Sequence, residues 1–581
     1  MREIHVDEQR LATGVLVIGT GAAGLRAAIE LQERGVPVLC VGKRRRDDAH
    51  TVLAAGGINA ALGTMDPEDS WEQHAADTLR ESYWLADPRS VELLCREAPD
   101  AIEDLVRFGA RFAREPDGRL SQRFFGAHRY RRTCFAGDYT GREIQLALVR
   151  RATELGVEIR DDLYVTRLLV HHGRVFGAYG FDLDDGSRRL VLADAVVLAA
   201  GGHTRIWRRS SSRRDENTGD AMRLAAAAGC RLQDMELVQF HPTGMVVPEE
   251  AAGTLVTEAV RGEGGILRNA RGERFMERYD PVRLELSSRD RVALANYTEI
   301  VEGRGTDRGG VLLDVSHLDR QVILERLPRM YRQFVDHAML DITREPMEVA
   351  PTAHYSMGGV KVDGETHATE VEGLYAVGEC ASGVHGANRL GGNSLAECIV
   401  FGRIVGREAA SVSASLDLHV RDRAAIDAAR DEVSEVLSRS GEEFARPLQR
   451  ELRDLMTECC GVVRSDDGLR RGLDRLERLA ERTQTLEVRP DLAGYADLGH
   501  SFDLAGSLLA ARATLECALE RRETRGAHNR ADFPQQDPEL RANLVWTLTG
   551  EVRPEPIGMP SAAVAALADD RELDVSGRLL E

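Results

Sequence analysis

The sequence predicts an α/β fold organised around a dinucleotide-binding unit. Two apolar runs, at 15–18 and 36–41, have the length of short strands, and a helical pattern over 23–34 lies between them. A glycine-rich turn at 19–24 joins the first strand to the helix. This β-α-β order directs the N-terminus of a helix at a bound pyrophosphate. We therefore expect a Rossmann-like domain with further parts attached to it.

The glycine turn has the spacing G-x-G-x-x-G, formed by Gly19, Gly21 and Gly24. Glycine at these positions permits a tight turn and close packing of the helix on the strand. The motif alone does not separate NAD from FAD. The acidic residue that usually binds the NAD ribose after the second strand is missing, because Gly42 and Lys43 stand there. The pattern therefore departs from that of common NAD-binding domains.

Later segments complete the predicted organisation. Short strands alternate with polar turns over 163–199, and a buried strand at 195–202 ends in glycines that suit a return to the nucleotide. The pattern over 371–410 is again strand then helix, 420–525 is amphipathic helix throughout, and the proline-rich C-terminal region looks irregular. The predicted parts are a Rossmann-like dinucleotide-binding domain at 1–241 and 351–415, an inserted α+β capping domain at 242–350, a helical domain at 416–530 and a short C-terminal region at 531–581.

Composition and charge exclude some classes of function. The chain has 581 residues, of which 43% are apolar, and a formal net charge of −19. Binding of nucleic acid depends on concentrated lysine and arginine, so this acidic balance argues against it. The same net charge does not attract an anionic substrate, which must then be held by a local group of arginines.

Membrane and metal signals are missing from the sequence. No apolar run is long enough for a direct membrane span, and the N-terminus lacks a secretory signal, so we expect a cytoplasmic protein. The nine cysteines are scattered and include no Cys-x-x-Cys. They indicate reduced thiols and no iron–sulfur, zinc or other metal site. If the protein moves electrons, it must pass them to a partner.

His50 is the most informative single residue. It lies in the run 49–58 beside Gly56 and Gly57, a pair that lets the backbone approach a flat ligand closely. An isolated histidine here would be interpreted as an ordinary loop residue. Several distinctive runs follow it in order and change that interpretation. These runs are 132–141, 238–244, 255–265, 354–359 with 385–395, and 522–530.

Together these runs resemble the flavoprotein subunits of succinate dehydrogenase and fumarate reductase, almost from end to end. The resemblance implies FAD as the cofactor, bonded covalently through its 8α-methyl group to His50. It implies succinate and fumarate as substrates, and an iron–sulfur subunit and membrane anchor subunits as partners. The chain would then be peripheral, at the cytoplasmic side of the cell membrane. Ala55 departs from the family, which commonly has glutamine or glutamate there.

The resemblance also implies which residues contact FAD. Glu379 matches a contact of the ribose or ribityl chain, Ser394 and Leu395 match the edge of the isoalloxazine, and Asp220 matches a further family contact. The residues predicted to contact the cofactor come from the glycine turn, the His50 run and the segments that return to the nucleotide. Its members are Gly19, Gly21, Ala22, Gly24, Lys43, His50, Thr51, Gly56, Gly57, Asp220, Glu379, Ser394 and Leu395.

For the substrate, the resemblance implies a clamp on a dicarboxylate. His241, Thr257, His354 and Arg389 resemble this clamp, which aligns the substrate with the flavin. Arginine suits the role because it can grip a carboxylate through two parallel N–H bonds. Phe125 fits an aromatic shield over the substrate, although a plain core role fits it equally well.

Arg289 matches the residue that exchanges a proton with a substrate carbon. Because the pKa of arginine exceeds about 12, a neighbour must replace the proton promptly. Glu258 and Arg261 match that relay, and their i, i+3 spacing places them on one face of a helical turn. The alternative is a structural ion pair for Glu258 and Arg261, and a solvated surface position for Arg289.

Other functions compete with succinate oxidation. Fumarate reduction uses the same residues, and covalent attachment favours the higher flavin potential that succinate oxidation requires. L-Aspartate oxidase shares the fold, and the runs 126–132 and 141–144 resemble it, but that family holds FAD noncovalently and has no histidine at the place of His50. A catalytically silent scaffold would need none of the clamp residues. We therefore expect succinate dehydrogenase, with fumarate reductase and L-aspartate oxidase as alternatives.

Overall fold

The computed structural model describes residues 7–414, 420–489 and 494–568, and the largest sheet among them has seven strands. The strand order is β6-β2-β1-β9-β8-β7, with β16 paired to β9 beside that path. The strands are β1 (Glu8–Ile18), β2 (Val38–Val41), β6 (Glu158–Arg160), β7 (Leu163–His171), β8 (Arg174–Asp182), β9 (Arg188–Leu198) and β16 (Leu374–Ala376). β1 runs parallel to β2 and β9, so the predicted β-α-β unit and fold class are confirmed.

The sheet separates two hydrophobic cores because side chains alternate along each strand. On β1, Val15 and Val17 point into one core, whereas Leu16 and Ile18 point into the other. The first face is covered by α1 (Ala22–Glu33), α3 (Pro88–Arg107), α4 (Thr140–Glu154) and α11 (Asn393–Ala414). The second is covered by α5 (Asp220–Ala228) and part of α15 (Ala496–Glu520).

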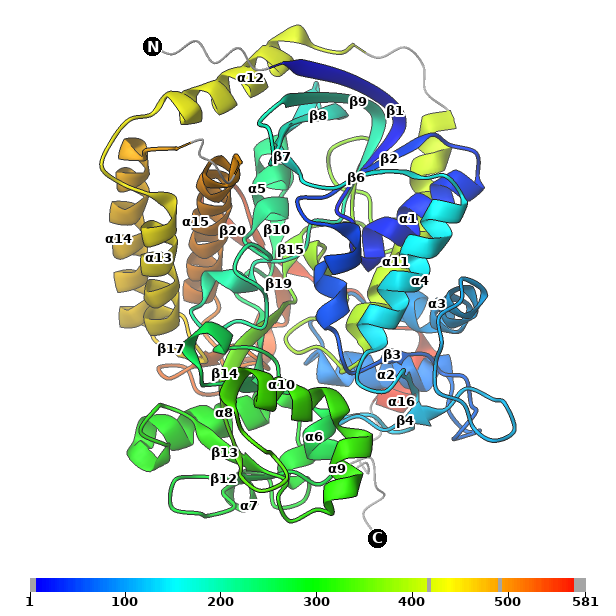
Figure 1. The fold of residues 1–581 in the computed structure, drawn as a ribbon, viewed down its shortest axis with the longest axis vertical. Helices are drawn as coiled ribbons and strands as arrows, with labels where there is room; N and C mark the ends of the chain where they lie inside the picture. Colours follow the sequence, from blue (N-terminus) through cyan, green and yellow to red (C-terminus); the bar gives the residue numbers. More distant parts are fainter. Residues whose placement is uncertain (1–6, 415–419, 490–493, 569–581) are drawn as a thin grey trace.

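A second, antiparallel sheet forms the lower part of the molecule in Figure 1, in the order β11-β14-β13-β12. Its strands are β11 (Val238–Met245), β12 (Ile266–Arg268), β13 (Val311–Asp314) and β14 (Met347–Ser356). The helices around it are α6 (Ala259–Gly262), α7 (Met276–Tyr279), α8 (Arg289–Glu299), α9 (Arg320–Arg326) and α10 (Pro328–Ala338). The inserted domain was predicted at 242–350, whereas this sheet begins at Val238 and ends at Ser356. The predicted domain boundaries stay predictions.

The helical part contains α12 (Arg423–Ser438), α13 (Ala445–Cys459), α14 (Asp466–Arg482) and α15, of which the last three lie side by side (Figure 1). The prediction of amphipathic helix throughout this part was wrong in two respects. α15 is buried on most of its faces, because it packs against α5 as well as α13 and α14. A short strand, β17 (Val463–Arg464), also interrupts the helices and pairs with β18 (Asn529–Arg530).

The C-terminal region is more regular than its prolines suggest. β19 (Ala542–Trp546) and β20 (Val552–Pro556) form a hairpin in the sheet β15-β10-β19-β20, and α16 (Ala562–Ala568) packs on α2 (Trp71–Glu81). β20 is an edge strand, where Pro554 and Pro556 remove no hydrogen bond that a central strand would need. The smaller strands are β3 (Ile58–Asn59), β4 (Gln122–Arg123), β5 (Thr133–Cys134), β10 (Leu232–Gln233) and β15 (Gly359–Val360).

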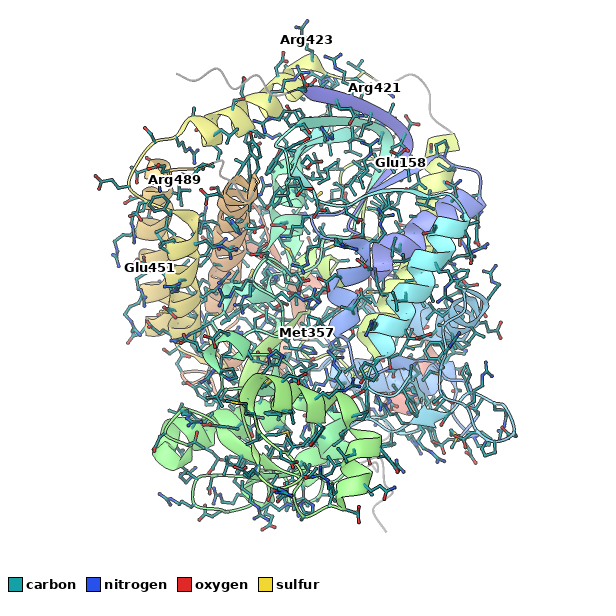
Figure 2. All side chains as sticks on the ribbon, in the orientation of Figure 1. Glu158, Met357, Arg421, Arg423, Glu451 and Arg489 are labelled. Atoms are coloured by element: carbon teal, nitrogen blue, oxygen red, sulfur yellow. The ribbon has the colours of Figure 1, made fainter. Side chains whose placement is uncertain are left out.

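The parts of the chain share a small core near the middle of the molecule. Met357, labelled there in Figure 2, is buried together with Leu85, Leu237, Ala387 and Ala527, which come from distant parts of the sequence. By contrast, Arg423 and Arg489 are labelled at the periphery. Among the described residues, no helix is both long and apolar enough to cross a bilayer. The described residues also include no His, Cys, Asp and Glu group suited to a metal ion.

Gly24 tests the packing of the nucleotide-binding turn. A Cβ on Gly24 would lie 2.0 Å from the carbonyl oxygen of Gly19, so any side chain forces α1 away from β1. We expect Gly24→Ala to lower stability by about 1–3 kcal/mol and to reduce flavin content, measured by thermal unfolding and absorbance. Gly558→Ala is the control, because a Cβ there meets nothing within 4 Å. Equal stability of the two variants would contradict the packing role.

Candidate active site

One cavity lies where four parallel strands end. β1, β2, β9 and β16 each stop at this edge, and the residues that follow them line the cavity: Gly19, Gly42, Ala199 and Val377. This edge is where open α/β sheets bind their ligands. From there the cavity extends to the second sheet. All the predicted site residues line it except Gly24, which packs behind the turn, and Arg261, which is buried beside Glu258.

Glycines shape the wall of the cavity. A Cβ on Gly19 would lie 2.1 Å from the carbonyl oxygen of Ala199, and a Cβ on Gly57 would lie 2.6 Å from that of Cys134. The hydroxyl of Thr51 accepts a hydrogen bond of 3.0 Å from the backbone N–H of Ala22 at the start of α1. The wall is therefore flat backbone beside a helix N-terminus, which fits a dinucleotide with its pyrophosphate at that end.

Lys43 lies between two buried carboxylates. Its Nζ is 2.6 Å from Asp220 and 3.0 Å from Asp503, and the hydroxyl of Tyr164 donates to Asp503 at 2.9 Å. Despite burial, these carboxylates raise the pKa of Lys43. The structure thus shows Lys43 and Asp220 paired with each other at the cavity wall, while their contacts with the cofactor stay predictions.

His50 and Glu379 are each held by a polar neighbour. The Nδ1 atom of His50 lies 3.0 Å from Glu216, which is far along the chain but on the same wall. The side-chain amide of Asn217 donates to both oxygens of Glu379, at 3.2 and 3.1 Å, and the N–H of Ser356 donates to one of them. Burial raises the pKa of Glu379. Both side chains are thus oriented by other groups of the protein.

Two guanidinium groups share one amide oxygen. The Oε1 atom of Gln239, on β11, accepts hydrogen bonds from Arg289 at 3.1 Å and Arg389 at 3.0 Å. Among the described residues, no carboxylate lies within ion-pair distance of Arg389, and its Nε atom is buried without a partner. Burial and the nearby Arg289 lower the pKa of Arg389 to about 9. This buried cation therefore lacks a counter-charge.

Glu258 carries the negative charge beside these arginines. Its Oε2 atom lies 2.8 Å from Arg289 and 3.8 Å from Arg261, which is one helical turn along the chain. Burial alone would raise the pKa of Glu258, but the two arginines lower it to about 2. Glu258 thus faces two guanidinium groups, and Arg389, which shares Gln239 with Arg289, adds a third positive charge without an ion-pair partner among the described residues.

Two imidazoles face the same space, with ring centroids 5.2 Å apart. The N–H of Thr243 donates to Nδ1 of His241 at 3.2 Å, which leaves the ring proton on Nε2. The Nδ1 atom of His354 lies 2.8 Å from the hydroxyl of Ser211. Burial lowers the pKa of both rings well below the usual value. His241 is therefore a neutral hydrogen-bond donor in the cavity.

Thr257 and Phe125 complete this region. Both are buried and both line the cavity. The ring of Phe125 lies 2.9 Å from the position that a Cβ on Gly56 would occupy, so it rests directly on the glycine wall. The cavity therefore has two regions: a flat backbone wall suited to a flavin dinucleotide, and a pocket of arginine and imidazole side chains suited to a small anion.

Family models cover most of the chain. The FAD binding domain model matches residues 14–395, and the model for the fumarate reductase flavoprotein C-terminus matches residues 449–557. The first match alone spans more than half of the chain. The chain belongs to the succinate dehydrogenase and fumarate reductase flavoprotein family. It is accordingly an FAD-dependent oxidoreductase, and the predicted family and enzyme class are confirmed.

Similar proteins include members from both halves of this family. One is a subunit of the CoM/CoB fumarate reductase of Methanothermobacter marburgensis, which is 45% identical over 94% of this chain and 98% of its own length. The succinate dehydrogenase flavoprotein subunit of Rickettsia bellii is 38% identical over 90% of each chain. Among solved structures, Mycobacterium smegmatis Sdh1 in complex with UQ1 has a TM-score of 0.87 and 39% identity, covering 96% of each chain.

Some residues of this flavoprotein's site were missed in the sequence. Gln239, Ser211, Glu216 and Asn217 hold predicted site residues through hydrogen bonds, yet none was predicted. Gln239 lies inside the run 238–244, which carries part of the family resemblance, but its hydrogen bonds to the two arginines were not predicted. The other three lie in or next to a polar loop before α5, where only the following Asp220 carried a family signal.

Lys43 allows a test of the buried charges. Lys43→Met leaves Asp220 and Asp503 facing each other without the cation that pairs with both, and we expect a loss of about 3–5 kcal/mol of stability. At least one carboxylate then has a folded-state pKa above its unfolded value. The folded state binds the extra proton, so stability should fall as pH rises through that raised pKa.

Thermal unfolding of Lys43→Met at several pH values measures this effect. Lys361→Met is the control, because its partner Glu555 is partly exposed and such pairs contribute only about 0–1 kcal/mol. Adding Asp503→Asn to Lys43→Met should restore part of the stability. A pH-independent loss, or no rescue, would contradict the charge argument.

Proposed function

We propose that this flavoprotein oxidises succinate to fumarate, with FAD bonded covalently to His50. The observation that carries the proposal is the pocket of Arg289, Arg389, His241 and His354 beside the glycine wall. It holds unneutralised positive charge in an acidic chain, as a dicarboxylate requires. The clamp comprises His241, Thr257, His354 and Arg389, with Phe125 as the shield.

The pocket divides the work between binding and proton transfer. Arg389 has no carboxylate partner within the described part of the chain and is fixed by Gln239, so it grips one substrate carboxylate. His241 donates from Nε2 to the other carboxylate. When bound, FAD supplies the hydride acceptor. Alignment of the two carboxylates with the flavin supplies part of the rate, on the order of 7–11 kcal/mol in well-oriented reactions.

Arg289 takes the proton from the neighbouring carbon in this proposal. Its guanidinium donates to Glu258, and Glu258 in turn lies near Arg261. As Arg289 receives the carbon-bound proton, it gives one of its own protons to Glu258, which can pass a proton on to Arg261, so no free, deprotonated guanidine accumulates. Arg261 is fixed beside Glu258 because it donates to the backbone carbonyl of Glu285.

Fumarate reduction is the second candidate, favoured by the relative that is 45% identical and named a fumarate reductase. We prefer succinate oxidation because a covalent flavin has the higher potential, and because relatives named succinate dehydrogenase match 90% or more of the chain. L-Aspartate oxidase is disfavoured by His50. The ratio of succinate oxidation to fumarate reduction by the native complex decides between the first two.

The proposed partners are an iron–sulfur subunit and membrane anchor subunits, which would hold this chain at the cytoplasmic side of the cell membrane. Relatives named as flavoprotein subunits support this arrangement. Among the described residues, the cysteines are not gathered into any group of three or more side chains that could hold a metal ion. Co-purification of the native protein tests the partnership, and a fully active homo-oligomer would contradict it.

Covalent FAD is the first test of this function. The wild-type band on a denaturing gel should fluoresce under ultraviolet light in acid, because the flavin remains bonded to His50. His50→Ala should bind FAD yet lose the fluorescent band. His172→Ala, in an exposed hairpin turn, is the control. Complete release of FAD from the wild-type protein by acid would refute the bond and favour L-aspartate oxidase.

The two arginines should fail in different ways. Malonate, a dicarboxylate inhibitor, reports on the clamp alone. Arg289→Lys should keep its affinity for malonate but lose turnover, because the clamp is intact and the proton route is not. Arg389→Ala should weaken malonate binding by about 10–150-fold, the value of a lost hydrogen bond to a charged group. Turnover and malonate affinity are measured for both variants at equal FAD content. Substantial turnover by Arg289→Lys would show that another group transfers the proton.

A further inference from the structure

We infer that Glu216 is the positioning residue for flavin attachment: its carboxylate holds the Nδ1 proton of His50 and leaves Nε2 free to bond the 8α carbon. The inference rests on the covalent bond proposed above. Glu216 lies in the loop just before α5, 166 positions from His50 in the sequence. Both residues line the same cavity.

Two arginines fix the Glu216 carboxylate in place. Its Oε1 atom forms ion pairs with Arg213 at 2.9 Å and with Arg44 at 3.3 Å. The other, Oε2, lies 3.0 Å from Nδ1 of His50 and accepts from the backbone N–H of Arg213 at 3.2 Å. Arg213 is itself fixed by Asp48. The arginines thus hold the carboxylate while one oxygen remains directed at the imidazole.

This carboxylate is charged across the physiological pH range. Its side chain is only 5% exposed, and burial opposes ionisation, but His50 and the two arginines lower the pKa of Glu216 to about 2. A carboxylate without its proton can only accept a hydrogen bond. The single proton of neutral His50 therefore resides on Nδ1, and the lone pair is on Nε2.

Nε2 has no competing partner. Among the described residues, Glu216 is the only group that hydrogen-bonds to the His50 ring, and the ring is 30% exposed toward the cavity. The tautomer that Glu216 selects is the nucleophilic one for a ligand in the cavity. The opposite tautomer would place a proton on the attacking atom and a lone pair against the carboxylate.

Attachment of the flavin to His50 exchanges one bond for another and releases protons that Glu216 can help to remove. One C–H bond of the 8α-methyl group breaks and one bond between that carbon and Nε2 forms. The ring would become cationic, so Glu216 stabilises the charge or receives the Nδ1 proton. In total, two protons and two electrons leave the methyl group and the imidazole. The two electrons and the methyl proton are taken up by the flavin ring, the Nδ1 proton leaves through Glu216 to solvent, and fumarate or dioxygen then reoxidises the flavin.

The experiment uses the full chain prepared without flavin and incubated with FAD and fumarate. Attachment is followed by fluorescence on denaturing gels and by intact mass, and total bound FAD is measured separately. Glu216→Gln should attach flavin about tenfold or more slowly at wild-type FAD content, since a charged hydrogen-bond partner is lost. Asp48→Asn is the matched control, because it removes a carboxylate of the same arginine cluster that does not touch His50.

The pH profile separates positioning from mere support of the fold. His50 is faced by Glu216, Glu379 and Arg213, with His354 nearby, and although burial opposes it, Glu216 raises the pKa of His50. Attachment should fall as pH drops through this pKa, because a protonated ring has no lone pair. In Glu216→Gln the pKa falls, so the acidic limb should move to lower pH while the plateau rate decreases.

The outcomes are distinguishable. Wild-type attachment rate and an unmoved acidic limb in Glu216→Gln overturn the role of Glu216 but leave the covalent bond and the proposed function intact. A wild-type protein without covalent flavin overturns both the bond and this inference. If Glu216→Gln binds no FAD, the shorter Glu216→Asp decides: slower attachment at full FAD content supports the role, and wild-type speed overturns it.

Discussion

The burial of several guanidinium groups around one carboxylate is the constraint on which the site depends. Like charges in a desolvated cavity are costly unless they are paired or bound to acceptors. Glu258 offsets Arg289 and Arg261, while the amide oxygen of Gln239 holds Arg289 and Arg389 together. No described carboxylate pairs with Arg389, and a bound dianion would supply that counter-charge. The electrostatic cost of burying Arg389 therefore favours binding of the substrate.

The same interactions join the two sheets of the molecule. Gln239 belongs to β11 of the second sheet, whereas Arg389 comes from the segment before α11, which packs on the first sheet. The amide of Gln239 also donates to Asn388, and Asn388 donates to Asp290 beside Arg289 and to Glu81 at the end of α2. A displacement of one sheet against the other would break these bonds. The geometry of the clamp therefore depends on correct packing of the two parts.

Local patterns made the nucleotide-binding unit predictable, and distant partners made much of the site unpredictable. The β1-α1-β2 unit follows from apolar periodicity and from glycines such as Gly24, whose packing excludes any side chain. Glu216 and Gln239 act through partners that lie 166 and 150 positions away, so no local pattern announces their roles. β20 was missed because its prolines suit only an edge strand, and the sequence does not state which strands are edges.

The acidic net charge and the cationic pocket are compatible because they act over different distances. At physiological ionic strength, exposed charges are screened beyond about 8 Å. Most of the excess negative charge therefore contributes little inside the cavity, where Arg389 and Arg289 are mostly shielded from water and retain strong interactions. The distant field affects how often an anion arrives, and the buried arginines determine how firmly it is held. For a reaction that needs both carboxylates aligned with the flavin, firm holding is the property that the fold must provide.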